Sequence, residues 1–245
     1  MHRETFGWWS ERLQMHMPIV RYGHWGPAVL LFPTWAANHL EAEQKGLIGA
    51  VSHLLEAGRV TIFSIDSINP HAWCNDSVPM PEKARRQAAY SAYIEEEVVP
   101  HIRNVLQNPA ARVLGAGASF GAFFAANGLL RRPDLFSGML GMSGVYDLEH
   151  LLHGYSDDNV YFNNPSWYVP GLGDDARLAA IRSSPIHLIT GQGQWEVPAQ
   201  TLRFAEKLAG KGIGANVEVW GHDVAHDWPS WHRMLELGLR ERLGL

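Results

Sequence analysis

Cysteine is nearly absent from this chain: among 245 residues there is one, Cys74. A single cysteine cannot form a disulfide within the chain, so nothing in the sequence requires an oxidising compartment. Long apolar runs are missing as well. No apolar stretch is long enough to span a bilayer, and the first residues lack the apolar core of a signal peptide. These absences predict a cytoplasmic protein with no membrane-spanning segment.

Basic residues are also few. Lysine and arginine total 20 against 25 aspartates and glutamates, which gives a formal net charge of −5. A nucleic-acid surface needs clustered Lys and Arg to neutralise phosphates. The small cluster of Lys83, Arg85 and Arg86 precedes an acidic run at 95–97, a pattern typical of an exposed helix face. We therefore expect no nucleic-acid partner.

What the chain does contain is an alternation of short β-rich runs and longer helical patterns. This alternation predicts βαβ units and a mostly parallel sheet between two helical layers, in one α/β domain over residues 1–245. The composition, 46% hydrophobic and 18% charged, supplies enough apolar surface for such a core. The predicted strands are 17–22, 28–32, 60–65, 112–115, 138–142, 186–190 and 216–220.

The first predicted strand, together with residues 6–9, is expected to form an antiparallel edge before the parallel part begins. Pro100 is expected to kink or split the second helix, because proline cannot donate to the preceding turn. The predicted helices are 41–57, 81–106, the run after residue 119, 174–182, 198–210 and 228–243.

Residues 147–172 interrupt the alternation. They are rich in Tyr, Asn, Gly, Pro and His and show neither helical nor strand periodicity. A long irregular segment in a compact domain is usually functional, and ligands bind at the carboxyl ends of strands in open α/β sheets. We expect this segment to be a lid-like loop over that edge.

The sharpest motif is Gly117-Ala-Ser119-Phe-Gly121, between a predicted strand and a helix-forming run. In that context G-x-S-x-G forms a nucleophile elbow, a strained turn that exposes the serine hydroxyl. Small residues on either side let strand and helix approach closely. Ser119 is therefore the expected nucleophile.

A serine needs a base to take its proton, and the base needs a carboxylate to orient it. In chain order, acid and then histidine should follow the serine. His222 and His226 both lie after the last strand, whereas His187 lies within a strand and His232 within the last helix. We favour His226, because the proline at 229 marks a helix start just after it. His222 then braces the loop.

The acid is expected in the loop after the strand 186–190, where Glu196 is the only carboxylate. A purely structural role near a helix start, favourable to the helix dipole, stays open for it. Asp147 is the main alternative acid, and Asp223 is a weaker one because it lies only three residues from His226.

An acyl-transfer intermediate also needs two backbone N–H donors for its oxyanion. One is expected from Phe120, the residue after the nucleophile. The other should come from the loop after the strand 28–32, with Trp35 favoured and Thr34 close behind.

Two further constellations carry weaker signals. Gly115, Gly117 and Gly121 lack the G-x-G-x-x-G spacing of a dinucleotide loop. The set of His150, His153 and Asp157 has neither a cysteine partner nor a regular helical spacing, so a metal site is not expected there. No metal or organic cofactor is predicted.

Taken together, these motifs resemble the esterase branch of the α/β-hydrolase superfamily, which includes esterase D-like enzymes and mycolyltransferases. The resemblance implies Ser119 as nucleophile, His226 as base and Glu196 as acid. Residues 35–37 depart from the glycine-rich loop common among relatives, and no lipid-substrate feature is present, so mycolyl transfer does not carry over. The matching segments are Leu31–Thr34, Ile65–Ser67 with Trp73, Tyr93–Pro100, Met142–Asp147 and His226–Trp231.

The predicted function is hydrolysis of small-molecule carboxylic esters through an acyl-serine intermediate. An acyltransferase that uses the same triad is the alternative within enzymes, since only water exclusion separates the two. A hydrolase-fold binding protein without turnover is the alternative from another class. A homo-oligomer is compatible with the sequence, which does not specify the oligomeric state.

Overall fold

The strands form one mixed sheet. The computed structural model describes residues 1–173, 175–242 and 244. Its sheet has eight strands in the order β1-β2-β4-β3-β5-β6-β7-β8. The pairs β1–β2 and β2–β4 are antiparallel, and all other pairs are parallel. The strands are β1 (Arg3–Ser10), β2 (Met15–Tyr22), β3 (Ala28–Phe32), β4 (Thr61–Ile65), β5 (Val113–Ala118), β6 (Phe136–Met142), β7 (Ile186–Thr190) and β8 (Asn216–Val219).

All seven predicted strands are present, and the predicted antiparallel edge is β1 paired with β2. Every residue of β3, β4 and β7 is buried. A parallel sheet covered on both faces hides both sides of its strands, so their residues are mostly apolar. Strand β3 is apolar throughout, whereas β4 and β7 each include two polar residues. This apolar character made the strands predictable from the sequence.

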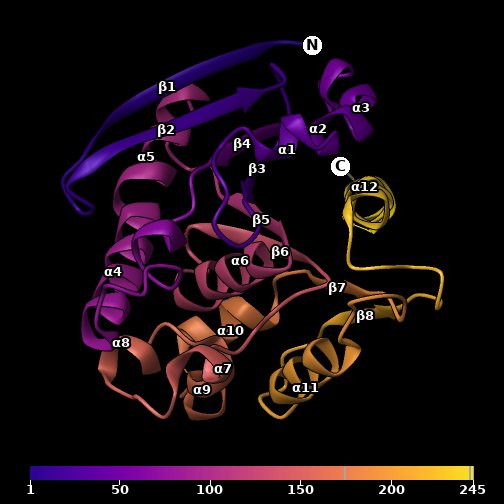
Figure 1. The fold of residues 1–245 in the computed structure, drawn as a ribbon. Coiled ribbons are helices and arrows are strands. Elements are labelled where there is room, and N and C mark those ends of the chain that lie inside the picture. Colours follow the sequence, from indigo (N-terminus) through magenta and orange to yellow (C-terminus); the bar gives the residue numbers. More distant parts are fainter. Residues whose placement is uncertain (174, 243, 245) are drawn as a thin grey trace.

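Helices cover both faces of the sheet, as predicted (Figure 1). On one face α4, α5, α6, α10 and α11 contribute to the larger apolar core, and on the other α2, α3 and α12 contribute to a second core. The bounds are α1 (Glu41–Gln44), α2 (Leu47–Ala50), α3 (Ser52–Glu56), α4 (Met80–Tyr93), α5 (Val99–Val105), α6 (Phe120–Arg131), α10 (Ala176–Arg182), α11 (Pro198–Ala209) and α12 (Trp228–Leu237), with short turns η1 (Asn69–His71) and η4 (Gly238–Arg242).

One helix prediction needs correction. The helix predicted over 41–57 is three short helices, α1 to α3, because Gly46 takes a left-handed conformation with φ of 79° and Val51 leaves the helical region. The helix predicted over 81–106 is confirmed as a continuous helical run of α4, the π-helical turn η2 (Ile94–Val98) and α5. The irregular turn η2 lies just before Pro100, where the proline is expected to split the helix.

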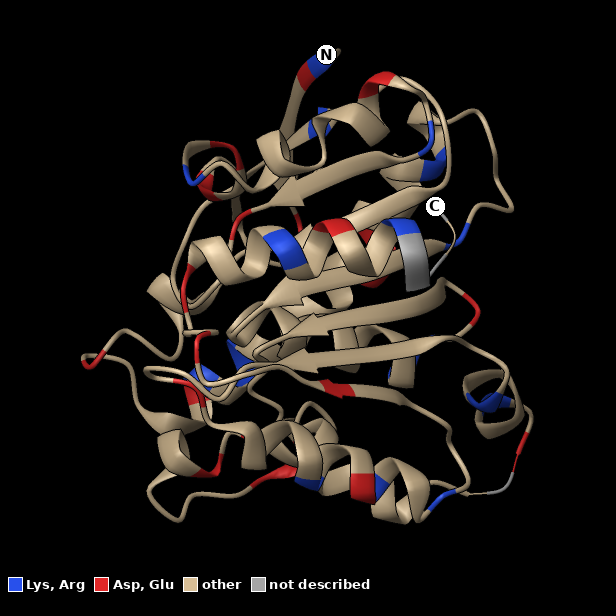
Figure 2. Ribbon diagram, turned by 90° about the vertical axis from the view of Figure 1, so that its right-hand side faces the viewer, with Lys and Arg blue, Asp and Glu red and all other residues tan. Residues whose placement is uncertain are grey.

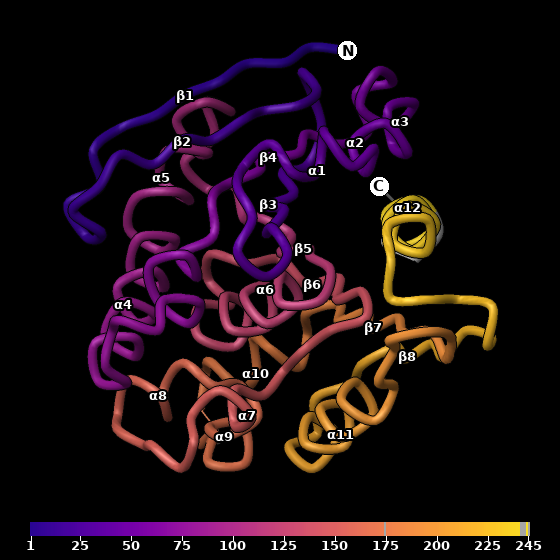
Figure 3. Tube along the Cα trace, in the orientation of Figure 1, coloured from indigo at the N-terminus to yellow at the C-terminus, as the bar shows by residue number. Residues whose placement is uncertain are grey.

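The segment 147–172 is not an irregular loop. It contains α7 (Glu149–Leu152), α8 (Asp158–Tyr161), α9 (Pro165–Tyr168) and the turn η3 (Val169–Gly171). Figure 3 follows this part of the chain from β6 to α10. The short helices pack against α4, α6 and α11. The segment is thus part of the helical layer, and its role as a lid stays a prediction.

Two predicted helix ends fall outside the described residues. The helix predicted over 174–182 is α10, and its first predicted residue, Asp174, is not described. The helix predicted over 228–243 is α12 followed by η4, and Leu243 is not described. The helix predicted over 198–210 is α11, which ends one residue earlier.

Charge is spread over the surface. On the side drawn in Figure 2, Lys and Arg segments alternate with Asp and Glu segments along the helices. Within the part of the chain that the structure describes, no helix is long and apolar enough to cross a membrane.

Candidate active site

Ser119 lies at the turn between β5 and α6. Its backbone has φ of 54° and ψ of −118°, a conformation that serine rarely adopts and that costs roughly 1–3 kcal/mol. A Cβ on Gly117 would lie 2.4 Å from the carbonyl carbon of Gly121, and one on Gly121 would lie 2.7 Å from the Phe32 carbonyl oxygen. The two glycines of the motif are therefore required by close backbone approach. This is the strained turn that the motif predicts.

Backbone hydrogen bonds hold this turn in place. The Ser119 N–H donates to the Met142 carbonyl over 2.9 Å, and the Val145 N–H donates to the Ser119 carbonyl over 3.1 Å. Both partners belong to β6 or the residues directly after it. The neighbouring strand thus fixes where the Ser119 side chain stands.

His226 faces the serine. Its Nε2 lies 3.0 Å from Ser119 Oγ, within hydrogen-bond distance. The residue sits in the loop between β8 and α12, where Asp227 is the N-cap of α12 and a proline follows in the first turn. The Trp231 ring, one turn into the helix, meets the His226 ring edge-on at 5.0 Å between centroids. The helix start therefore positions the imidazole.

Glu196 lies on the other side of the His226 ring. Its side chain is 1% exposed, and its Oε2 lies 3.7 Å from His226 Nδ1. The same oxygen accepts a hydrogen bond from Thr190 Oγ1 over 3.1 Å, and Oε1 accepts a short one from Ser143 Oγ. A carboxylate held this way is fixed in orientation next to the imidazole.

The loops that carry the glutamate and the histidine are bonded to each other. The Gly193 N–H donates to the Val224 carbonyl over 2.8 Å, and the His226 N–H donates to the Gln194 carbonyl over 2.9 Å. A Cβ on Gly193 would lie 2.6 Å from the Val224 oxygen, so glycine permits the contact. Acid and base therefore keep their relative positions through main-chain contacts.

The environment of Glu196 shifts its pKa. Burial raises the pKa of the Glu196 carboxyl, but the facing His226 ring and the hydrogen bond from Ser143 outweigh burial, so the pKa lies below its ordinary value. The site therefore stabilises the ionised form, which is the form that can stabilise an imidazolium.

This shift predicts a pH-dependent stability difference. A carboxyl whose pKa is lowered on folding stabilises the fold above its unfolded pKa, and this contribution is lost as the pH falls through the folded pKa. We therefore expect Glu196→Gln to be less stable than wild type near neutral pH, with the gap in free energy of unfolding shrinking as the pH falls below the ordinary pKa of a glutamate. Urea unfolding of both proteins across this range measures it, and a constant gap would contradict the assignment of the charge.

Asp147, the main alternative acid, is bound elsewhere. It accepts hydrogen bonds from the Glu149 N–H over 3.0 Å and from Asn164 Nδ2 over 2.9 Å, and it lies 3.8 Å from Lys207 Nζ. These contacts place it in the segment after β6, and the structure brings Glu196, not Asp147, to the imidazole.

The other histidines and Asp223 occupy separate places. His222 Nδ1 lies 3.3 Å from the Gln192 carbonyl, in the bracing position expected for it. His187 pairs with Glu218 at 2.9 Å. Asp223 lines a cavity with Trp220 and Arg233.

The turn after β3 distinguishes the two candidate oxyanion donors. The Thr34 N–H donates to Glu41 Oε2 over 2.9 Å, so it is already engaged. The Trp35 carbonyl instead accepts from Ser67 Oγ over 2.9 Å and from Asn69 Nδ2 over 2.7 Å, which fixes the loop here. No hydrogen bond to a described residue occupies the N–H of Trp35.

Phe120 is the first residue of α6, so its N–H is one of those that a helix leaves without an internal partner. The Phe120 ring is buried, and the Trp35 ring packs edge-on against it at 5.0 Å between centroids. The structure thus brings together both residues favoured as donors.

The residues considered for a metal site do not assemble. Asp157 accepts a hydrogen bond from the Val160 N–H over 2.8 Å as the N-cap of α8. In the described residues no group of three or more His, Cys, Asp or Glu side chains is placed to hold an ion.

Sequence reasoning missed the groups that support the acid. Ser143 is buried and has φ of 48°, and besides contacting Glu196 it accepts a hydrogen bond from Trp231 Nε1 over 3.1 Å. Trp231 therefore touches the histidine directly and the glutamate through Ser143. Both residues lie in segments that carried the family resemblance, which was the only available signal.

Residues 50–241 match the model of a family described as "Putative esterase". No curated protein was found to match the chain in sequence. Among solved structures, a ferulic acid esterase superposes with a TM-score of 0.74 at 20% identity, covering 97% of this chain and 96% of the other.

Two further structures share the fold at low identity. S-formylglutathione hydrolase from Staphylococcus aureus superposes with a TM-score of 0.66 at 13% identity, over 97% of this chain and 95% of the other. MPT51 from Mycobacterium tuberculosis gives 0.72 at 12% identity, over 100% and 98%. The sheet, the flanking helices and these neighbours establish the α/β-hydrolase fold. Since the family model covers most of its length, the chain belongs to this esterase family of the α/β-hydrolase superfamily and is an ester-hydrolysing enzyme.

Proposed function

We propose that the enzyme cleaves carboxylic esters through an acyl-serine intermediate on Ser119. The serine oxygen attacks the ester carbonyl while His226 takes its proton, and the imidazolium then protonates the departing alcohol. Water, deprotonated by the same histidine, attacks the acyl-serine, releases the carboxylic acid and restores the serine hydroxyl. Glu196 orients the imidazole and stabilises its positive charge. No metal or organic cofactor takes part.

The observation that carries this proposal is the contact of 3.0 Å between His226 Nε2 and Ser119 Oγ at a strained turn. A surface serine has no need of an unfavourable backbone conformation. Here the conformation exposes a hydroxyl to a histidine whose other ring nitrogen faces a buried carboxylate. Strained backbone conformations of this kind cluster at active sites and ligand-binding sites.

For the oxyanion we propose the N–H groups of Phe120 and Trp35. The engagement of Thr34 with Glu41 supports Trp35 over its neighbour. Main-chain donors fixed before the reaction stabilise developing charge without reorganisation, which is their advantage over water. We further propose that residues 1–245 act as one domain, with the segment 147–172 bordering the substrate site.

The acid assignment is tested by Glu196→Gln, with Asp147→Asn as the matched control. The glutamine keeps the shape but removes the charge that stabilises the imidazolium in the transition state, so we expect kcat to fall by roughly 100-fold or more with little change in KM. Asp147→Asn should stay within about threefold of wild type, because Asp147 contacts Lys207 and Asn164. Steady-state kinetics on a p-nitrophenyl ester measures both, and the reverse order would move the acid to Asp147.

A further inference from the structure

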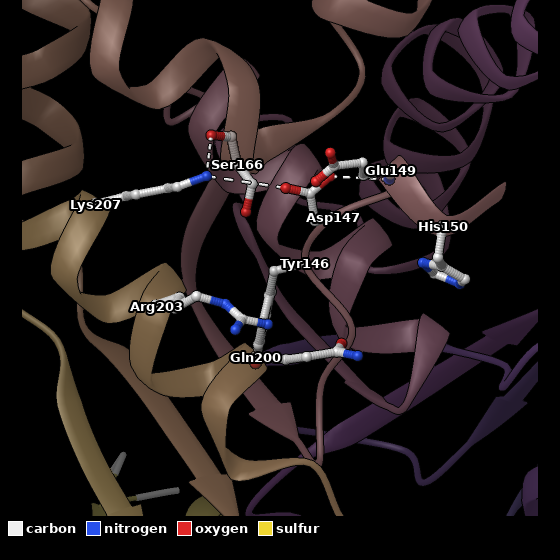
Figure 4. Close-up of a pocket in the computed structure, with 8 residues that line it drawn as sticks. All are labelled: Tyr146, Asp147, Glu149, His150, Ser166, Gln200, Arg203 and Lys207. Carbon is white, nitrogen blue, oxygen red and sulfur yellow. Dashed lines mark hydrogen bonds and ion pairs between the residues drawn. The ribbon is translucent and has the colours of Figure 1, made fainter. Parts of the chain in front are cut away.

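A cavity of about 610 Å³ is lined by residues that lie close in sequence to Ser143 and Glu196, whereas Ser119, His226 and Glu196 are not among its lining residues. Figure 4 shows its wall, which is polar and carries both signs of charge. It lies between the segment that follows β6 and one face of α11. The lining residues are Tyr146, Asp147, Glu149, His150, Ser166, Gln200, Arg203 and Lys207.

One wall continues directly from the residues that touch the catalytic groups. Ser143 binds Glu196, and the Val145 N–H donates to the carbonyl of Ser119. The next residue, Tyr146, lines the cavity. Within four residues of the chain, Ser143 contacts Glu196, Val145 contacts Ser119 and Tyr146 lines the cavity.

The opposite wall continues from the acid. Helix α11 begins at Pro198, two residues after Glu196. Gln200, Arg203 and Lys207 lie along it at spacings of three and four residues and so share one face. A substrate that occupies the cavity while its ester lies at Ser119 would extend between these two walls.

Two of the four charged residues on these walls, Lys207 and Asp147, compensate each other. Lys207 Nζ donates to the Ser166 carbonyl over 2.8 Å and lies 3.8 Å from Asp147 Oδ2. Figure 4 shows both contacts. Glu149 is exposed at the start of α7, where water screens its charge.

Arg203 is exposed, as Glu149 is, but it carries the opposite charge. Neither a hydrogen bond nor an ion pair links its guanidinium to any residue that the structure describes. In Figure 4 the side chain extends from α11 into the cavity, in the direction of Tyr146 and Gln200. A planar guanidinium offers paired donors that match a carboxylate, and the Gln200 amide adds another donor from the same helix face.

We propose that Arg203 is a specificity-determining residue that binds a carboxylate carried by the ester substrate, at a position remote from the scissile bond. The inference rests on the proposed function, since it assumes that the ester is cleaved at Ser119. The enzyme then prefers anionic esters over neutral ones of the same shape, in spite of its own negative net charge.

Matched ester pairs test this preference. The first pair is 4-acetoxybenzoate and 4-acetoxybenzamide, which places the carboxylate or its neutral counterpart on the alcohol side. The second pair, monophenyl glutarate and phenyl glutaramate, places it on the acyl side. The readout is the ratio of kcat/KM for the anionic ester to that for the neutral ester, because damage to the fold lowers both values together.

In wild type we expect a ratio of at least tenfold in one pair, equivalent to about 1.4 kcal/mol. Arg203→Gln should bring that ratio close to one, mainly through a higher KM for the anionic ester. Arg203→Lys keeps the positive charge but loses the planar guanidinium with its paired donors, so it should retain part of the preference for the anionic ester. Arg177→Gln is the control, since Arg177 is an exposed arginine on α10 that lines a different cavity; its ratio should equal that of wild type.

A ratio near one in both pairs for wild type, or an unchanged ratio in Arg203→Gln, would overturn the carboxylate site while leaving ester hydrolysis at Ser119 standing. If wild type cleaves none of the four esters and no serine-directed reagent modifies Ser119, the proposed function itself fails, and the specificity proposal fails with it. The two failures are therefore distinguishable.

Discussion

Ser119→Ala is expected to lower kcat for ester hydrolysis by roughly four to six powers of ten. The substitution removes the only hydroxyl that lies within hydrogen-bond distance of His226 Nε2 among the described residues. Without it no acyl-enzyme forms, and only binding and the backbone N–H donors still favour the reaction. Initial rates with a p-nitrophenyl ester measure the loss. The enzyme concentration must be high enough to detect the residual activity.

The fold should survive this change, because alanine is smaller than serine and the backbone contacts of the turn do not involve the hydroxyl. Circular dichroism and Tm close to wild type would show that the lost activity is chemical. Ser183→Ala supplies the control: Ser183 is exposed after α10, and its hydroxyl donates to the nearby Ala180 carbonyl. If Ser119→Ala keeps more than about a hundredth of wild-type kcat, Ser119 is not the nucleophile.

His226→Ala should cost about as much as Ser119→Ala, because the serine is a weak nucleophile without its base. His222→Ala should stay within about threefold of wild type, since its ring contacts the Gln192 carbonyl and not the serine. The double variant Ser119→Ala/His226→Ala should be little worse than either single one, because the members of a triad act as a unit. The measurements are kcat/KM values for all four proteins.

An additive loss in the double variant would mean that the two residues act independently. An equal fall in kcat/KM for His222→Ala and His226→Ala, on proteins shown to be folded, would mean that His226 is not the sole base. A larger fall in kcat/KM for His222→Ala than for His226→Ala would assign the base role to His222. It would mean that the 3.0 Å contact between His226 Nε2 and Ser119 Oγ is not used in catalysis.

The strained turn at Ser119 and the helix start after His226 could be predicted because their signals are local. Glycines flank Ser119 where the backbone approaches closely, and the helix start after His226 is marked by its cap and proline. The central strands could be predicted as well, since burial on both faces makes their residues mostly apolar.

Other features depend on contacts between distant residues. The hydrogen bond that supports the proposed donor Trp35 over Thr34 joins the Thr34 N–H to Glu41, which lies in a different element. The support of Glu196 by Ser143 joins residues 53 positions apart. The helices α7, α8 and α9 have four residues each, too few to show a helical period in the sequence.

The most direct test of the account is the site of covalent labelling by a fluorophosphonate. The reagent reacts with a serine whose hydroxyl is activated by a neighbouring base, so it reports the nucleophile without any assumption about the substrate. If Ser119 is the nucleophile, we expect one adduct per chain, mapped by peptide mass spectrometry to Ser119, with labelling abolished in Ser119→Ala and strongly slowed in His226→Ala. An adduct on Ser143 or Ser67, or none on protein that hydrolyses esters, would contradict it.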